Sequence, residues 1–269
     1  MENQKEIYFH VGTGKTGSTY LQQKVFPKIK GLKYLPTHKF YSYPQFLNQS
    51  RATKILLSRE FDRQLEEEIA TFSKYYANIT PIITFRKHSA YITSQYKRFV
   101  KNGYQMDFNS FFNLEDTGYF KIKHLHYKYQ IELLQKYFTQ PPIVLNFSDL
   151  KNNPKNYITK LTKAIDAPIN LEEINLNPFH TSYNNKQLKL MLKFGKIISL
   201  KKRSISRFKI IQLIWKFLIF FPLRYSLLIA FKYTPSLFID QEPLIDPDKL
   251  AAIDDYFLKD WEYIKQKSL

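Results

Sequence analysis

The chain contains no cysteine among its 269 residues. This absence excludes disulfide bonds, thiolate metal sites and cysteine nucleophiles, and cysteine usage therefore gives no sign of an oxidising compartment. Glycine is also scarce, with seven residues in all, yet three of them fall within residues 12–17. Glycines at this spacing let the backbone turn tightly and approach a ligand closely.

Acidic residues are absent from Ile174 to Ile239, a segment that carries twelve lysine and arginine residues. A formal net charge of +18 alone suggests nucleic acid as a partner. The excess is concentrated in this one segment, however, and no nucleic acid is expected. The region 184–240 is predicted to form a basic helical insertion or subdomain within a single α/β domain over 1–269.

The basic segment includes an apolar run, Ile210–Phe231, broken by Lys216, Pro222 and Arg224. A membrane span needs about 20 mainly apolar residues with few charges, so no transmembrane helix is expected. One interpretation is peripheral contact of 201–232 with an anionic membrane. Another is a helical pair packed on the domain with solvated lysines. A basic groove for an anionic polysaccharide is compatible with either.

No N-terminal signal is expected, because the first six residues are polar and the apolar run after them is only strand-length. The predicted location is the cytoplasm, with possible peripheral attachment to the inner face of the membrane.

A glycine-punctuated turn lies between an alternating strand pattern, Ile7–Val11, and the helical pattern that begins near Leu21. The helix start, the Lys15 side chain and nearby hydroxyls would form a phosphate cradle. A Walker A loop requires Gly-x4-Gly followed at once by Lys. Here Ser18 takes the lysine position, so the turn predicts a different phosphate site.

The segment Lys-Thr-Gly-Ser-Thr at 15–19 resembles the 5′-phosphosulfate loop of sulfotransferases that use 3′-phosphoadenosine 5′-phosphosulfate (PAPS). The resemblance implies that PAPS is the sulfuryl donor, that 3′,5′-adenosine bisphosphate (PAP) is the product, and that no metal is required. The cofactor-binding residues that it implies in this loop are Gly14, Lys15, Thr16, Gly17, Ser18 and Thr19.

A second motif of the family is an arginine at a strand end and a serine eight residues later, which hold the 3′-phosphate. Arg86 follows the apolar strand pattern Pro81–Phe85, and Ser94 lies eight residues on. A guanidinium fork suits a doubly charged phosphate. By the same resemblance Lys186, with Asn184 and Asn185, would lie on a late loop over this phosphate, although the family's usual Arg-Lys-Gly pattern is absent.

A third similarity covers Tyr119–Pro154, where a helix precedes the strand Ile143–Phe147 and an acidic turn. Strand and helix patterns alternate along the chain, which predicts a P-loop-like three-layer α/β/α fold with a central parallel sheet. The remaining expected elements are a loop over 31–50, a strand Ile55–Leu57, helices Phe61–Tyr76 and Tyr119–Phe138, a loop Gly103–Thr117, and a terminal helix Asp254–Trp261.

Sulfuryl transfer needs a base, in-line geometry and charge stabilisation on the leaving phosphate. Lys15 is predicted to neutralise the leaving oxygen. Glu60 is the first choice for the base, His38 the second and His10 the third. Glu60 can also be interpreted as a carboxylate that favours a helix N-terminus.

The predicted activity is transfer of a sulfuryl group to a hydroxyl, or less readily an amine, of a carbohydrate or glycolipid. Two alternatives stay open. One is a P-loop-type kinase that requires ATP and Mg²⁺, and the other is a non-catalytic basic protein that binds membrane or nucleic acid. No His, Asp or Glu cluster has metal-ligand spacing.

Overall fold

A computed structural model describes residues 5–176, 183–197, 208–235 and 242–269. The chain forms two compact units. The first comprises Met1–Tyr91, Ile122–His180 and Asp255–Leu269, and the second comprises Ile92–Lys121 and Thr181–Asp254. The predicted region 184–240 falls within the second unit, together with a segment from the middle of the chain.

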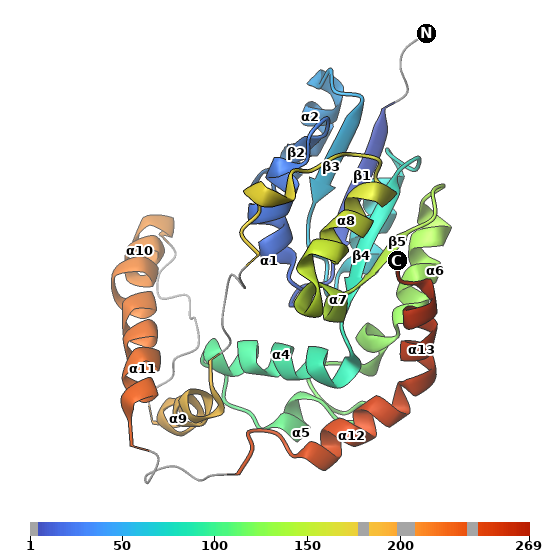
Figure 1. Ribbon diagram of the computed structural model, residues 1–269. Coiled ribbons are helices and arrows are strands. Elements are labelled where there is room, and N and C mark those ends of the chain that lie inside the picture. Colours follow the sequence, from blue (N-terminus) through green and yellow to red (C-terminus); the bar gives the residue numbers. More distant parts are fainter. Residues whose placement is uncertain (1–4, 177–182, 198–207, 236–241) are drawn as a thin grey trace. The chain divides into compact units, whose positions relative to one another are not determined.

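The first unit is built on one five-stranded, wholly parallel sheet in the order β2-β3-β1-β4-β5 (Figure 1). Strands β1, β3 and β4 are apolar and buried because helices cover both faces of the sheet, as parallel sheets require. The strands are β1 (Glu6–Gly12), β2 (Lys33–Leu35), β3 (Lys54–Ser58), β4 (Thr80–Phe85) and β5 (Ile143–Asn146). The predicted α/β fold with a central parallel sheet is confirmed.

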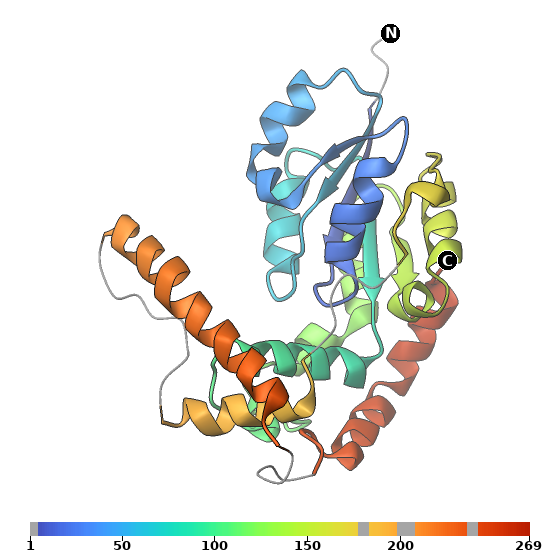
Figure 2. The same cartoon turned by 60° about the vertical axis from the view of Figure 1, so that its left-hand side comes forward.

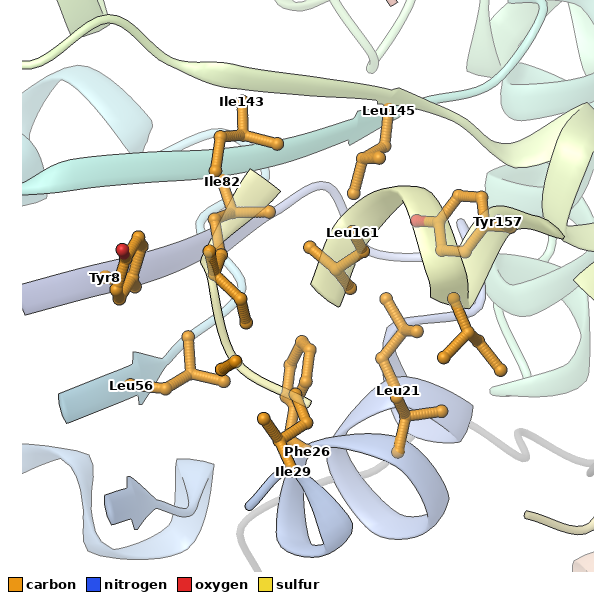
Figure 3. Close-up of a cluster of buried hydrophobic side chains, with 14 of the residues drawn as sticks. Tyr8, Leu21, Phe26, Ile29, Leu56, Ile82, Ile143, Leu145, Tyr157 and Leu161 are labelled. Carbon is orange, nitrogen blue, oxygen red and sulfur yellow. The ribbon is translucent and has the colours of Figure 1, made fainter. Parts of the chain in front are cut away.

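One face of the sheet packs against the helices that follow β1 and β5 (Figure 3). Their buried side chains include Leu21, Phe26, Tyr157 and Leu161, which meet Tyr8 of β1. The helical elements on this face are α1 (Ser18–Tyr20), η1 (Leu21–Val25), η2 (Phe26–Lys28), α7 (Phe147–Asn152) and α8 (Pro154–Ala164).

The opposite face carries α3 (Leu65–Ser73), α6 (Tyr127–Tyr137) and α13 (Leu258–Lys267). Phe9 of β1 points to this side and its ring lies 4.6 Å from that of Phe72. Tyr8 and Phe9 therefore anchor opposite layers from adjacent positions, as period-two alternation predicts.

Several element boundaries differ from the sequence expectations. The predicted loop 31–50 holds β2, η3 (Thr37–Ser42) and α2 (Tyr43–Gln49), and α5 (Phe108–Phe111) lies in the second predicted loop. Helix α3 starts four residues later than expected, and α6 starts eight residues later because η4 (Ile122–Leu125) precedes it. The terminal helix is divided at Phe257 into α12 (Pro247–Tyr256) and α13.

The second unit contains most of α4 (His88–Lys101), with α9 (Asn185–Gly195), α10 (Lys209–Ile214), η6 (Trp215–Phe220) and α11 (Phe221–Tyr233). Helices α9 and α11 pack side by side. Gln187 of α9 donates a hydrogen bond to the Leu228 carbonyl at 2.7 Å.

Candidate active site

The carboxyl ends of three neighbouring strands bring the first-unit candidates together. Strand β1 lies between β3 and β4, so the loop after β1 has the residues after β3 on one side and those after β4 on the other. Glu60 follows β3 and Arg86 follows β4. Ligands of open α/β sheets bind at this edge, where strand order switches direction.

The loop after β1 is fixed by hydrogen bonds to the end of β4. Thr13 donates to the Thr84 carbonyl from its backbone N–H at 3.2 Å and from its hydroxyl at 3.0 Å. The Thr16 hydroxyl donates to the Thr13 carbonyl inside the loop. The loop is therefore held in one shape by its own polar groups.

Close packing beneath the loop requires glycine at position 17. Gly17 has φ +82°, and a Cβ there would lie 2.5 Å from Leu150 Cδ2. Helix α1 begins at the next residue, so the loop passes straight into a helix N-terminus. Lys15 also has a positive φ, +67°, and its side chain is exposed.

Arg86 joins the two motifs directly, because its Nη1 donates to the Lys15 carbonyl at 3.2 Å. The guanidinium also stacks over the Phe147 ring, 4.9 Å from its centroid. In the described part of the chain no carboxylate pairs with it, and burial lowers the pKa of Arg86 below its ordinary value. A partly buried cation without a carboxylate partner favours an anionic ligand.

Two carboxylates lie on the other side of the loop, beside Gly14. The Gly14 N–H donates to Asp62 Oδ1 at 2.7 Å. A Cβ at Gly14 would lie 2.8 Å from that oxygen and 3.0 Å from Glu60 Oε2. Asp62 was not among the sequence candidates, although it lies only two residues after Glu60.

Side-chain hydrogen bonds link Glu60, through Gln22 and Ser58, to the buried His10. Gln22 Nε2 donates to Glu60 Oε1 at 3.2 Å and to Ser58 Oγ at 3.0 Å. His10 Nδ1 lies 2.9 Å from the same Ser58 oxygen. Gln22 was likewise missed, because its partners lie 36 and 38 residues away and no local pattern marks them.

The three candidate bases differ in accessibility. Glu60 is half-buried at the loop, and His38 is exposed on η3. His10 is fully buried with its ring against Phe26, and burial lowers its pKa to about 4. His10 is thus neutral near pH 7 and enclosed by protein.

Two predicted cofactor residues belong to the second unit. Ser94 is half-buried on α4. Lys186 is in the first turn of α9 and donates to the Thr234 carbonyl at 2.8 Å. The expected late loop is wrong at this point, since Asn184 caps α9 in a capping box and Asn185 begins the helix.

The residues at the loop fit a phosphosulfate group. The loop exposes a lysine, leads into a helix N-terminus, and has a half-buried arginine at its edge. Among the described residues, no group of three His, Cys, Asp or Glu side chains has the arrangement of a metal site.

No protein-family model matches the chain, and no curated protein matches it in sequence. Its structure is similar to that of a sulfotransferase from Alicyclobacillus acidocaldarius, with a TM-score of 0.51 and 13% identity over 75% of this chain and 98% of that one. It also matches mouse sulfotransferase SULT7A1 complexed with PAP, with a TM-score of 0.47 and 9% identity over 99% of this chain and 90% of that one.

The likeness to the bacterial enzyme shows that this chain has a sulfotransferase fold. The resemblance drawn from the two motifs is therefore confirmed at the level of the fold. The roles of the individual site residues stay predictions, because a shared fold does not assign a side chain its chemistry.

Proposed function

We propose that this protein transfers a sulfuryl group from PAPS to a hydroxyl of a carbohydrate or glycolipid. The observation that carries the proposal is the contact between the two phosphate motifs. Arg86 and the Lys15 loop meet at the end of the sheet, 71 residues apart in sequence, and no carboxylate among the described residues pairs with the guanidinium. The arrangement brings a loop with a lysine, a helix N-terminus and a guanidinium together, which suits two phosphates of one nucleotide.

The chemistry would divide between the loop and the residues after β3. Glu60, after β3, would accept the proton of the acceptor hydroxyl while the hydroxyl oxygen bonds to sulfur. Lys15, in the loop itself, would stabilise the charge that develops on the PAP oxygen as the bond between that oxygen and sulfur breaks. The bound nucleotide supplies only the activated sulfuryl group.

Glu60 is favoured over the two histidines by its surroundings. Gln22 holds one of its oxygens, and its other oxygen is turned toward Gly14 of the loop. His10 is enclosed, and its lowered pKa makes it a poor proton acceptor near pH 7. The exposed His38 has no described contact with the loop and remains the second candidate.

The nucleotide assignment can be tested by calorimetric titration of PAP and, separately, of ATP with Mg²⁺. We expect PAP to bind without metal, and Arg86→Ala to weaken it about 100-fold, because two charge-assisted hydrogen bonds are lost. Arg86→Lys should recover only part of this affinity, since an ammonium cannot form the planar fork. Lys136→Ala is the matched control, because Lys136 lies in the last turn of α6.

A preference for ATP with Mg²⁺ would contradict the proposal and favour the kinase alternative. Unchanged PAP affinity in Arg86→Ala would remove Arg86 from the site. Once PAP binding is established, the acceptor is tested by sulfation of soluble glycans compared with glycolipids in vesicles. Glu60→Gln should then abolish transfer without weakening PAP binding.

A further inference from the structure

Helices α10, η6 and α11 follow one another without a break as one long helix from Lys209 to Tyr233 (the orange helix in Figure 2). Together with Phe208 we call this segment the apolar helix. Of the twenty large hydrophobic side chains exposed in the described part of the chain, twelve belong to it. Monomeric proteins rarely leave so concentrated an apolar surface uncovered unless it contacts something.

The apolar helix has one shielded face. Lys216, Phe220, Arg224 and Leu228 follow one another at intervals of four residues, and the last three are buried. The α11 part of this face packs against α9 within the second unit, where Gln187 donates a hydrogen bond to the Leu228 carbonyl. The most exposed side chains of the helix include Ile210, Leu218, Ile229 and Tyr233, which are between 61% and 75% exposed.

The two cations in the middle of the helix do not interrupt its exposed side. Arg224 is 6% exposed and stacks against the Phe220, Phe221 and Tyr225 rings, 5.2–5.3 Å from their centroids. Lys216 is half-buried over Phe221 at 5.2 Å. The two cations that interrupt the apolar run thus lie on the shielded face, and the outer face is mainly apolar.

By length and composition, Ile210–Tyr233 would suffice for a membrane span, with 24 residues and an 18-residue stretch of mean hydropathy 1.6. A span would carry Lys216 and Arg224 into the hydrocarbon, where a charged side chain is costly near the bilayer centre. A span would also bring the polar residues of the adjoining α9 into contact with lipid. A helix lying in the interface keeps both cations with the protein and immerses the exposed face alone.

The charge of the surrounding segment indicates what kind of surface binds the exposed face of the apolar helix. The segment Ile174–Ile239 carries twelve basic and no acidic residues, including Lys193 and Lys196 near the end of α9. Four of the basic residues, Lys201, Lys202, Arg203 and Arg207, lie outside the described residues. A second copy of this chain would bring the same positive charge to the contact and be repelled. An anionic lipid surface supplies both the opposite charge and the apolar layer.

We propose that the apolar helix, Phe208–Tyr233, docks this protein on an anionic bilayer surface by lying in the lipid interface. Trp215, 37% exposed, takes part at the headgroup boundary, where tryptophan is favoured. The inference does not depend on sulfuryl transfer, because no residue of the loop takes part in it.

The test is co-sedimentation of the full chain with phosphatidylcholine vesicles, with or without phosphatidylglycerol. We expect at least tenfold stronger binding to the anionic vesicles, and weaker binding when salt is raised. Leu218→Ser with Ile229→Ser should reduce binding at least tenfold, because two exposed apolar side chains are removed. Tyr75→Ser is the matched control, as Tyr75 is 75% exposed in the first unit.

Trp215 fluorescence reports how deeply the helix enters. The chain has two tryptophans and Trp261 is buried, so the difference between wild-type and Trp215→Phe spectra isolates Trp215. We expect a blue shift with vesicles and stronger quenching by lipids brominated near the headgroups than by lipids brominated near the bilayer centre. This measurement uses folded wild-type protein and does not depend on the double variant folding.

Three results would overturn the proposal. The first is no binding to anionic vesicles. The second is self-association that buries Trp215 in the absence of lipid. The third is quenching strongest at the bilayer centre together with resistance to alkaline extraction, which would establish a span instead.

Discussion

His10 provides a quantitative test of how the buried residues that support Glu60 are arranged. The imidazole lies at the end of β1, is fully buried, and contacts Ser58, which Gln22 links to Glu60. Burial lowers its pKa from 6.5 to about 4. At about 1.4 kcal/mol per pH unit, this difference corresponds to about 3 kcal/mol of linkage between protonation and folding.

The direction in which stability changes with pH follows from which state, folded or unfolded, binds the proton. Between pH 6.5 and about 4 the unfolded chain protonates His10 while the folded chain keeps it neutral. The folded state therefore loses stability as pH falls through this window, and above pH 6.5 the group contributes no pH dependence. The perturbation that removes the linkage is His10→Asn, whose amide nitrogen can replace Nδ1 as the partner of Ser58 but does not titrate.

The assay is urea unfolding from pH 7.5 to 4.5, followed by Trp261 fluorescence in a Trp215→Phe background. Trp261 belongs to the same unit as His10. The variant is expected to be less stable than wild type at pH 7.5, but this difference in unfolding free energy should shrink by between about 2 and about 3 kcal/mol at pH 4.5. For His38→Asn, at an exposed position, the difference in unfolding free energy from wild type should stay constant over the same pH range. A His10→Asn difference that changes by less than about 1 kcal/mol would refute the inference that His10 is held neutral.

Three further predictions concern particular contacts. Gly17→Ala should lower the melting temperature much more than Gly31→Ala, and calorimetry of both variants tests this. Both glycines have positive φ, but a new Cβ at Gly17 would lie within 4 Å of Leu150 and Phe147, whereas one at Gly31 would meet nothing at that distance. Asp62→Asn should tighten PAP binding several-fold by removing about 1 kcal/mol of repulsion beside the loop, and weaker binding would instead make the carboxylate a positioning group for Gly14. Asp260→Asn should cost about 2 kcal/mol of stability in urea unfolding, since the carboxylate accepts from His88 and two backbone N–H groups, whereas Asp255→Asn at an exposed position should be neutral.

The sequence was sufficient to predict the buried strands of the fold. β1, β3 and β4 are apolar runs bounded by turns, and their alternation with helical patterns predicts a parallel sheet. Strand β2 was missed because three edge residues carry too little periodicity. Helix α2 was missed because Pro44 and the surrounding tyrosines resemble a loop, although proline at N1 or N2 is compatible with a helix start.

For the site, sequence patterns were informative where the chemistry is local. The Lys15 loop and the strand-end Arg86 each have a local pattern, and the rule that ligands bind at carboxyl ends predicts that they meet. Gln22 and Asp62 have no such pattern, because their importance arises from side-chain contacts across 36 to 48 residues. The roles of Ser94 and Lys186, both in the second unit, stay predictions.

The strand order explains why an acid and a cation can work on opposite sides of one loop. Because β1 lies between β3 and β4, the loop after it separates Glu60 and Asp62 from Arg86. Had β3 and β4 been neighbours, as consecutive strands often are, the carboxylates and the guanidinium would have been free to pair and neutralise each other. With the loop between them, the guanidinium lies on the side proposed for a phosphate, and Glu60 lies on the side proposed for proton transfer. The crossover from β3 to β4 over β1 is thus the feature of the fold that keeps proton acceptance and phosphate binding in separate places.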